Sequence, residues 1–441
     1  MENKFSRSNW INLLLFGLIG QIAWAVENMY FNLFVFETIE PNLNAITLMV
    51  QLSGVAATFV TLIAGTLSDK LGNRRSFISF GYAIWGVTVM LFGFISPSVA
   101  ESLFGMDHTS AVKLALAAVI IGDCVMTLFG STANDAAFSS WVTDNTESSY
   151  RGQVESVLSV LPLAAMLIVA GGFGILVSLI GYKLLFLFLG LVISGSGIAG
   201  IFILKDSERL EKSGTLRDMI YGFKPSSVKA NKPFYVTLLI ACVYGIACQT
   251  FMPYMIIYMK TYLGFTVIEY SIVFGLAIAL GAAINIFLGR LSDKMDKVRA
   301  MYIATAIFAA GLFAMFVSKG MGKTGTLITF GLSGFVMICG YIYISALSGA
   351  IIRDNTPADK TGKLQGVRMI FFVLIPMLVG PMIGNAINSS AGIPLPDGGA
   401  DTMTTLFIPA PGIYLSASIT ALVMFALIPL LQKVSKANKC D

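Results

Sequence analysis

The sequence predicts an all-α membrane protein whose twelve transmembrane helices form two six-helix bundles. Three observations support this fold class: the composition, the number of long apolar runs and an internal repeat. Of the 441 residues, 56% are hydrophobic and only 12% are charged, and the mean hydropathy is +0.80. Soluble domains carry about 25% charged residues. The chain therefore has too few charges to cover several soluble cores, and it is too apolar to be disordered.

Each transmembrane helix needs about 20 mostly apolar residues. The runs are continuous rather than alternating, which excludes a β-barrel. The first run is too long for a cleaved signal peptide, so we expect it to remain in the protein. The fifth and sixth runs are separated only at Gly181-Tyr182-Lys183. The twelve predicted spans are 9–36, 45–68, 76–96, 111–141, 152–180, 183–204, 233–259, 267–289, 299–318, 324–350, 363–388 and 411–432.

Lysine and arginine set the orientation, because loops on the cytoplasmic side carry an excess of both. Most of the 29 Lys and Arg residues fall in loops that share a side with the N-terminus. We therefore expect a multi-pass protein of the inner membrane of a prokaryote, with both termini in the cytoplasm. This bias also accounts for the net charge of +5, so no nucleic-acid partner is expected. The cysteine spacing indicates neither a metal site nor a disulfide framework.

An internal repeat relates the two halves. Residues 205–232 form a charged linker between an N-terminal bundle, 1–204, and a C-terminal bundle, 233–441. A GxLSDK pattern follows the second predicted span of each half, at Gly65 and at Gly289. After the fourth span come Asp144-Asn145-Thr146 and Asp354-Asn355-Thr356, each eight residues before a glycine. Parallel six-span repeats related by pseudo-twofold symmetry are typical of transporters with a site at the repeat interface.

The first loop resembles the signature of the major facilitator superfamily, G-x-L-x-D-x-x-G-x-R-R. It matches at Gly65, Leu67, Asp69, Gly72, Arg74 and Arg75. The second copy departs from the signature, because Asp296 replaces the glycine. The stretches 134–144 and 151–155 are similar to the glycoside–pentoside–hexuronide:cation symporters and the sucrose-transporter-like branch. The second span lacks the paired aspartates that bind sodium in melibiose-permease-like members. The resemblance implies the major facilitator fold and alternating access.

The resemblance also implies a set of gating residues at the cytoplasmic side. Asp69 would face the start of the eleventh span near Gly362, and Asp293 the start of the fifth near Gly152, where unpaired N–H groups favour a carboxylate. Arg74 and Arg75 would hold neighbouring acidic groups, although positive-inside topology alone also explains them. Further candidates at these helix ends are Arg151 with Glu155, which could be a simple interfacial ion pair, and Arg368, which could reach the cavity or the surface.

Three acidic residues lie inside predicted spans, where an ionised side chain costs about 2.5–3.5 kcal/mol. Glu27 is in the first span, and Asp123 and Asp135 are in the fourth. Buried carboxyls are candidates for carrying a coupling ion, H⁺ or Na⁺. A fixed structural role is the alternative for Glu27 and Asp123, and Asp135 could instead serve the gate. The only histidine, His108, falls in a predicted loop, so carboxyls are the candidates for proton transfer.

Polar and aromatic side chains on three spans are candidates for binding the substrate. Aromatic faces stack on sugar rings, and amides bond to their hydroxyls, although Tyr and Trp also form membrane-interface belts. In the first span a stripe with about 100° between residues is a candidate cavity lining. The candidates are Gln21, Trp24, Asn28, Phe31 and Asn32, together with Tyr244, Tyr254 and Tyr341.

These patterns predict a monomeric secondary transporter, most simply a proton- or sodium-coupled symporter of a sugar or glycoside, with no cofactor beyond the coupling ion. The alternative is a proton-coupled multidrug or metabolite exporter of the same fold, which the 21 Met and 32 Phe residues permit. A membrane enzyme or receptor is not expected, since the sequence shows no nucleotide loop, no nucleophile–histidine pair and no sizeable domain outside the membrane.

Overall fold

The computed structural model describes residues 6–147, 150–207, 222–292, 295–318, 322–356, 361–395 and 406–437. In these ranges eleven helical stretches are long and apolar enough to cross a membrane. One of them, 156–203, holds two predicted spans. Its backbone leaves helical geometry at Gly181, with φ 75° and ψ 166°, a conformation open to glycine because it has no Cβ. The expected division between the fifth and sixth spans therefore falls at Gly181, and the predicted all-α membrane fold is confirmed.

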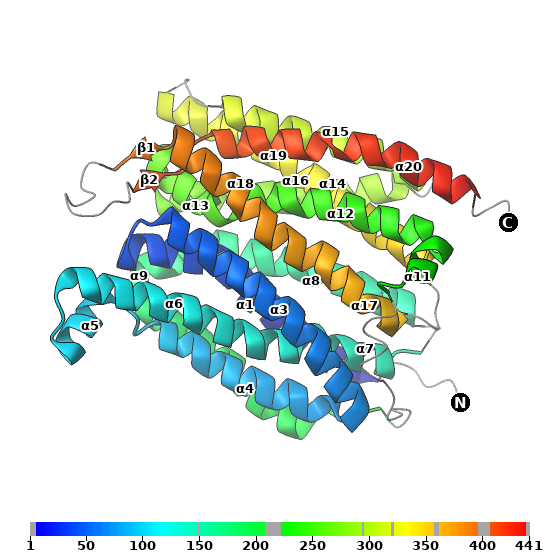
Figure 1. The fold of residues 1–441 in the computed structure, drawn as a ribbon, viewed down its shortest axis with the longest axis horizontal. Coiled ribbons are helices and arrows are strands. Elements are labelled where there is room, and N and C mark those ends of the chain that lie inside the picture. The colour runs from blue at the N-terminus through cyan, green and yellow to red at the C-terminus, as the bar shows by residue number, and fades with distance from the viewer. Residues whose placement is uncertain are drawn as a thin grey trace. The chain divides into compact units, whose positions relative to one another are not determined.

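The chain divides into two compact units, each described here by itself. The first comprises Met1–Glu40 and Leu52–Leu216. Its helices, coloured blue to green in Figure 1, are α1 Arg7–Val26, η1 Glu27–Phe31, α2 Asn32–Phe34, η2 Val35–Ile39, most of α3 Leu43–Leu71, α4 Arg74–Phe92, α5 Pro97–Phe104, α6 His108–Gly130, η3 Ser131–Phe138, α7 Ser139–Asn145, α8 Arg151–Ile168, η4 Val169–Phe173 and α9 Gly174–Ile203.

The second unit comprises Pro41–Gln51 and Arg217–Asp441. Two short strands, β1 Ile393–Pro394 and β2 Phe407–Ile408, pair antiparallel and were not predicted. The helices are α11 Pro225–Ala230, α12 Lys232–Phe251, η5 Met252–Tyr254, α13 Met255–Ile257, η6 Tyr258–Tyr262, α14 Val267–Ser292, α15 Lys297–Val317, α16 Gly322–Asp354, α17 Thr361–Met369, η8 Ile370–Leu374, α18 Ile375–Ala391, α19 Gly412–Leu422 and α20 Met424–Ala437.

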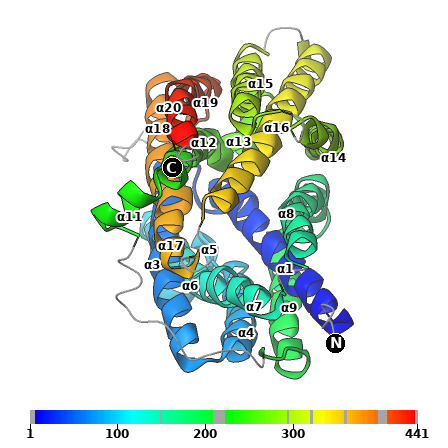
Figure 2. The same ribbon diagram turned by 90° about the vertical axis from the view of Figure 1, so that its right-hand side faces the viewer.

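Glycines let α4 and α9 pack closely in the first unit, where α4 lies between α6 and α9 (Figure 2). A Cβ added at Gly190 would meet the backbone oxygen of Gly86, and one added at Gly197 would meet backbone atoms of Ser79 and Ala83. Small residues at such contacts let helix backbones approach each other inside a membrane. The glycines in the sixth span therefore fix the position of α4, the helix that follows the signature loop.

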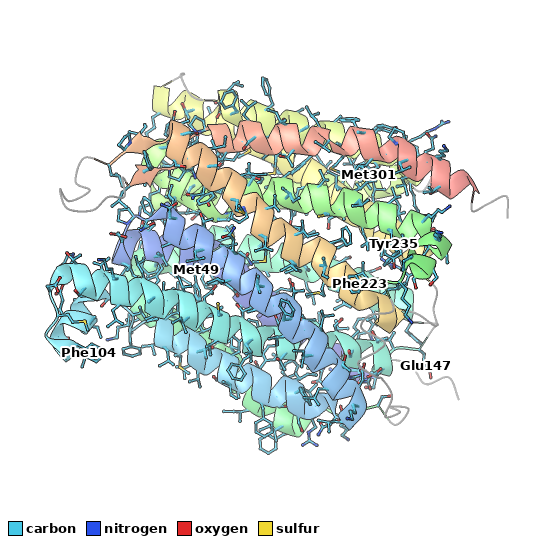
Figure 3. All side chains as sticks on the ribbon, viewed as in Figure 1. Met49, Phe104, Glu147, Phe223, Tyr235 and Met301 are labelled. Carbon is cyan, nitrogen blue, oxygen red and sulfur yellow. The ribbon has the colours of Figure 1, made fainter. Side chains whose placement is uncertain are left out.

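The outward faces of the helices are apolar. Phe80, Phe188 and Phe202 are among many large hydrophobic side chains that stay exposed. Figure 3 shows such side chains around the helices, and it places Phe104 at the exposed end of the short helix α5. Exposed apolar surface of this extent is what a protein solvated by lipid presents. His108, expected in a loop, is instead the first residue of α6, where it pairs with Glu101 at 2.6 Å.

Candidate functional site

Two acidic side chains are buried in the middle of the first unit. Glu27 begins η1, a π-helical segment that interrupts the first span, and Asp123 lies within α6. Their exposed fractions are 7% and 1%. The two carboxyls lie within electrostatic reach of each other. π-Helical turns inside α-helices occur frequently at functional sites, so local backbone geometry and burial single out the same position.

Hydroxyl groups from two other helices surround the Glu27 carboxyl. The Oγ of Ser53, from α3, lies 2.9 Å from Glu27 Oε1, and the Oγ1 of Thr127, from α6, lies 3.2 Å from the same atom. The two hydroxyl oxygens are 2.7 Å apart. Ser53 also bonds to Asp123. Three oxygens thus form a closed triangle, and η1, α3 and α6 meet around it.

The triangle holds more oxygen contacts than its hydroxyls can satisfy. Each hydroxyl supplies one hydrogen, so Ser53 and Thr127 together can occupy two of the three O···O contacts. A proton on the Glu27 carboxyl supplies the third hydrogen. An ionised Glu27 could receive both hydroxyl hydrogens, but the 2.7 Å contact between Ser53 and Thr127 would then hold none. A proton on Glu27 therefore completes the triangle, and the additional contact from Ser53 to Asp123 needs one more hydrogen, which a protonated Asp123 could supply.

The remaining carboxyl oxygens of this group lack compensating partners. Among the described residues, Glu27 Oε2 and Asp123 Oδ1 have no hydrogen-bond partner. Within the same ranges neither carboxyl forms an ion pair with Lys, Arg or His. Two adjacent buried carboxylates with no cation between them would be very costly. The site therefore needs a proton or a metal cation to remain buried.

Asp135, the third predicted acid, lies in η3 on the same transmembrane segment as Asp123. Its carboxylate accepts hydrogen bonds from Ser131 Oγ at 3.0 Å and Asn134 Nδ2 at 3.2 Å. The Tyr82 hydroxyl, from α4, lies 2.9 Å from Asn134 Oδ1 and so holds the amide in place. Asp135 also acts electrostatically on Glu27. The structure thus brings all three predicted acids into one unit.

Some side chains of the predicted stripe on the first span donate hydrogen bonds to backbone carbonyls of the same span. Asn28 Nδ2 donates to the Trp24 carbonyl at 2.8 Å, and Asn32 Nδ2 donates to the Asn28 carbonyl at 2.9 Å. Trp24 packs against Trp85, with ring centroids 4.9 Å apart. Phe31 is buried against Phe92 and Phe186, at 4.4 and 5.0 Å. Gln21 and Trp24 stay half-buried.

The predicted tyrosines form two separate groups in the second unit. Tyr244 OH donates to the Tyr341 carbonyl at 3.1 Å, and the rings of Tyr244 and Tyr341 are 5.6 Å apart. Both rings are half-buried. Tyr254 is fully buried, and its hydroxyl contacts Thr47 Oγ1 at 2.6 Å and the Pro381 carbonyl at 3.1 Å. Tyr244 and Tyr341 retain accessible surface, whereas Tyr254 is committed to contacts with protein.

Arg74 is the centre of the signature loop. Its guanidinium forms ion pairs with Asp69 and with Asp144, the latter at 3.0 Å, and donates to Ser68 Oγ at 2.6 Å. The Asp206 carboxylate accepts the backbone N–H groups of Arg74 and Arg75, at 3.0 and 2.8 Å. The Arg75 side chain donates to the Ile201 carbonyl. The loop is therefore tied to α7 and to the end of α9.

The two halves repeat this arrangement at their DNT motifs. Lys297 pairs with Asp354 at 2.6 Å, so an acid that follows the fourth span again meets a base at the start of the third. The side chains of Asn145 and Asn355 bond to the carbonyl four residues earlier, at 2.8 and 2.7 Å. Thr146 and Thr356 do the same, both at 2.6 Å. The sequence repeat is thus also a repeat of hydrogen bonds.

Several predicted gating residues lie outside what the structure describes. Asp293 is one of them, and the side chains of Arg151 and Glu155 are not described either, nor are the surroundings of Gly152 and Gly362, the helix starts that the two acids were expected to face. Arg368 is described: it is exposed, with its guanidinium 5.4 Å from the Phe372 ring centre. The gating assignments stay predictions.

No pattern in the sequence indicated a role for Ser53, Tyr82 or Asp206. Their importance comes from partners on other helices, namely Glu27, Asn134 and the start of α4. A serine or tyrosine in an apolar span carries no signal of its partner. Asp206 did not stand out among the many charges of the linker, 205–232, in which it lies.

Membrane-length helices around buried carboxyls that have no cationic side chain as partner among the described residues are typical of a polytopic membrane transport protein. Residues 13–381 match the Major Facilitator Superfamily, and the chain belongs to this family. No curated protein sequence matches the chain. Because the family and its structural neighbours are transporters, the chain is a transporter and not an enzyme.

The fold is shared with solved transporters at low sequence identity. A crystal structure of a point mutant of the nucleoside transporter NupG superimposes with a TM-score of 0.69 at 10% identity, covering 96% of this chain and 99% of that one. A bacterial homologue of the lysosomal transporter Spinster gives 0.65 at 14%, covering 98% of both. A bacterial homologue of the iron transporter ferroportin gives 0.62 at 14%, covering 96% and 98%.

Proposed function

We propose that this transporter is a proton-coupled symporter that imports a sugar or glycoside by alternating access. The observation that carries the proposal is the buried group of Glu27, Asp123, Ser53 and Thr127. Its carboxyls have no cationic partner among the described residues, and its oxygen triangle is fully paired with a proton on Glu27. Na⁺ is the other cation that such an oxygen-rich site could bind.

Coupling follows from the cost of burying charge. With protons bound, Glu27 and Asp123 are neutral and remain buried at little cost. Without them, an ionised carboxyl costs about 2.5–3.5 kcal/mol inside the membrane, so the empty site favours a state in which water reaches it. Asp135, nearer the cytoplasmic end of its span, is placed to exchange protons with that side. Proton binding thereby biases the equilibrium between two states.

The substrate class rests on chemistry and on resemblance. Half-buried aromatic rings at Trp24, Tyr244 and Tyr341 supply faces for a sugar ring, and the Gln21 amide is available for its hydroxyls. The stretches 134–144 and 151–155 are similar to the glycoside–pentoside–hexuronide:cation symporters. Nucleosides are N-glycosides, so the nucleoside transporter among the structural neighbours supports including them among the ligands to test.

The remaining assignments complete the proposal. The protein acts as a monomer in the inner membrane of a prokaryote, with both termini in the cytoplasm, and its bundles are 1–204 and 233–441, joined by 205–232. Asp69 and Asp293 help to close the cytoplasmic side, with Arg74, Arg75, Arg151, Glu155 and Arg368 as further gate residues.

Uptake into proteoliposomes tests the proposal. The purified protein is first screened by thermal shift against sugars, glycosides and nucleosides, because a ligand of the folded state raises the melting temperature. Uptake of the best ligand is then driven by an inward pH or Na⁺ gradient. Asp123→Asn should abolish concentrative uptake and leave exchange of labelled substrate. Asp107→Asn is the matched control, since Asp107 is an exposed N-cap on the same helix and Asn also caps.

The outcomes are distinct. Proton symport is supported if a pH gradient drives concentrative uptake in the wild type and in Asp107→Asn but not in Asp123→Asn. Undiminished pH-driven uptake in Asp123→Asn contradicts it. If a Na⁺ gradient alone drives uptake, the coupling ion is Na⁺ and not the proton. Binding confined to lipophilic cations, with outward movement against protons, refutes sugar import.

A further inference from the structure

A chain of hydrogen bonds links Asp135 to the backbone of the first span. Asp135 Oδ1 lies 3.2 Å from the Asn134 amide nitrogen, and Asp135 Oδ2 lies 3.0 Å from Ser131 Oγ. The amide oxygen of Asn134 lies 2.9 Å from the Tyr82 hydroxyl, which in turn lies 2.7 Å from the Phe16 carbonyl of α1. Asn134 is 6% exposed and Tyr82 is fully buried, so the two side chains satisfy each other rather than water.

A glycine brings this chain against α1. A Cβ added at Gly20 would meet both Asn134 Oδ1 and the Tyr82 hydroxyl, so the absence of a side chain there lets both polar groups reach the helix. The Asn134 amide is packed in place, but it can still turn over about its last bond. The two orientations have the same shape and exchange a donor for an acceptor at each end.

The number of hydrogens decides which orientation suits each form of Asp135. With Asp135 ionised, Ser131 and the Asn134 amide donate to it, and the one Tyr82 hydrogen must serve two oxygens. One of the four contacts then holds no hydrogen. With Asp135 protonated and the amide turned over, Asp135 donates to the amide oxygen. The amide nitrogen then donates to the Tyr82 oxygen, Tyr82 donates to the Phe16 carbonyl, and all four contacts are paired.

Among the described residues Asp135 takes part in no ion pair, so no bound cation fixes its charge. Its segment η3 packs against α1, α4, α6 and α7. Trp24 lies near Asp135, and an indole N–H can donate to either form of a carboxyl. The acids on these helices and on the adjoining η1 are Glu27, Asp123 and Asp144. The basic residues on the same helices all lie in the first two turns of a helix and are Arg7, Arg74, Arg75, His108 and Lys113.

We propose that Asn134 is a proton-linked amide switch, which turns over when Asp135 is protonated and is positioned by Tyr82. The inference rests on the proposed role of Asp135 in proton exchange. Protonation leaves the Tyr82 hydrogen to the Phe16 carbonyl alone and so strengthens the bond between α4 and α1. Because α1 continues into η1, the switch acts on the same helix that carries Glu27.

Infrared titration of the purified full chain tests the switch without substrate or gradient. The carboxyl C=O band that Asp135→Asn removes reports the protonation of Asp135. Tyr82→Phe takes two hydrogen bonds from the protonated form and one from the ionised form. We therefore expect about fivefold weaker proton binding, which lowers the midpoint of this band by about 0.7 pH unit. Tyr235→Phe also removes a buried hydroxyl that donates to a backbone carbonyl, but in the second unit, and should leave the midpoint unchanged.

A double variant separates action through the amide from direct action. In an Asn134→Leu background Tyr82→Phe should no longer shift the midpoint, since the remaining bond from Tyr82 to Phe16 is the same in both forms. A second band makes the test independent of how Asn134→Leu folds: in the wild type the tyrosine C–O band should change at the midpoint of the Asp135 band, and Tyr82→Phe should abolish that change.

Three results overturn the switch: an unchanged or raised midpoint in Tyr82→Phe, a shift that persists in the Asn134→Leu background, or a tyrosine band that does not follow Asp135. Proton symport and the switch can fail separately. Undiminished pH-driven uptake in Asp123→Asn refutes symport and leaves this titration as it is, whereas a failed titration leaves the uptake result standing.

Discussion

Removal of the Arg74 side chain should destabilise the protein far more than removal of its neighbour Arg75. Arg74 is 5% exposed and holds two carboxylates and a hydroxyl, from Asp69, Asp144 and Ser68. Breaking a fully buried ion pair costs about 3–5 kcal/mol, because the remaining charge is left without a partner. Here the acid side chains of Asp69 and Asp144 are 39% and 24% exposed, so water screens part of that cost.

We therefore expect Arg74→Ala to lower the free energy of unfolding by about 2–3 kcal/mol, between the values for buried and for surface pairs. Arg75→Ala removes an exposed side chain and should cost about 0–1 kcal/mol. Unfolding of the lipid-free protein in mixed micelles with increasing SDS, followed by tryptophan fluorescence, measures both. A double-mutant cycle with Asp144→Asn should show a coupling energy of about 1 kcal/mol or more.

Equal destabilisation by the two arginine variants would refute the reasoning. So would a coupling energy near zero, since Asp144 would then not depend on the Arg74 guanidinium. Either result would mean that Arg74 reflects positive-inside topology alone and that its ion pairs do not stabilise the fold.

Two further predictions concern the first unit, one its buried hydrogen bonds and the other its helix packing. Ser53→Ala breaks the oxygen triangle and removes one of the two hydroxyls that contact Glu27 Oε1. The pH for half-maximal proton-driven uptake should shift by about one unit, which corresponds to about 1.4 kcal/mol of differential interaction. Thr58→Ala, whose hydroxyl donates to the Gly54 carbonyl within its own helix, should leave that pH unchanged. Gly190→Ala places a Cβ against the Gly86 backbone and should lower the free energy of unfolding by about 1–3 kcal/mol. The control is Gly195→Ala on the same helix, whose Cβ meets open space, and it should be neutral or slightly stabilising. Equal unfolding free energies of the two glycine variants would contradict the close packing.

The sequence was sufficient for the spans and for the break at Gly181, because apolar length and a flexible residue are local properties. It was not sufficient for the coupling site. Glu27 and Asp123 were predicted from their cost in the membrane, but Ser53 acquires its role only from the helix that it meets. Regular spacing of 100° per residue also failed to predict the π-helical segments η1 and η3, in which the acids Glu27 and Asp135 lie.

The resemblance indicated a loop that acts across the two bundles. The described contacts of Arg74 lie instead within one unit, with Asp69 and Asp144. A motif in the sequence does not state which of its possible partners it contacts, because charge pairing depends on helices distant in the chain. The roles of Asp69 and Asp293 across the bundles stay predictions.

The π-helical turn at Glu27 has an evolutionary consequence. A turn closed by a bond to the fifth residue rather than the fourth accommodates one residue more than a regular turn. Loss of a single codon between Glu27 and Phe31 would therefore restore an unbroken helix and keep the span. It would also leave the side chains before and after the turn on the faces that they occupy now, because the extra residue is held within the turn. Among related genes, a one-residue gap at this point would mark lineages that lost the local turn at Glu27 and kept the rest of the span in place.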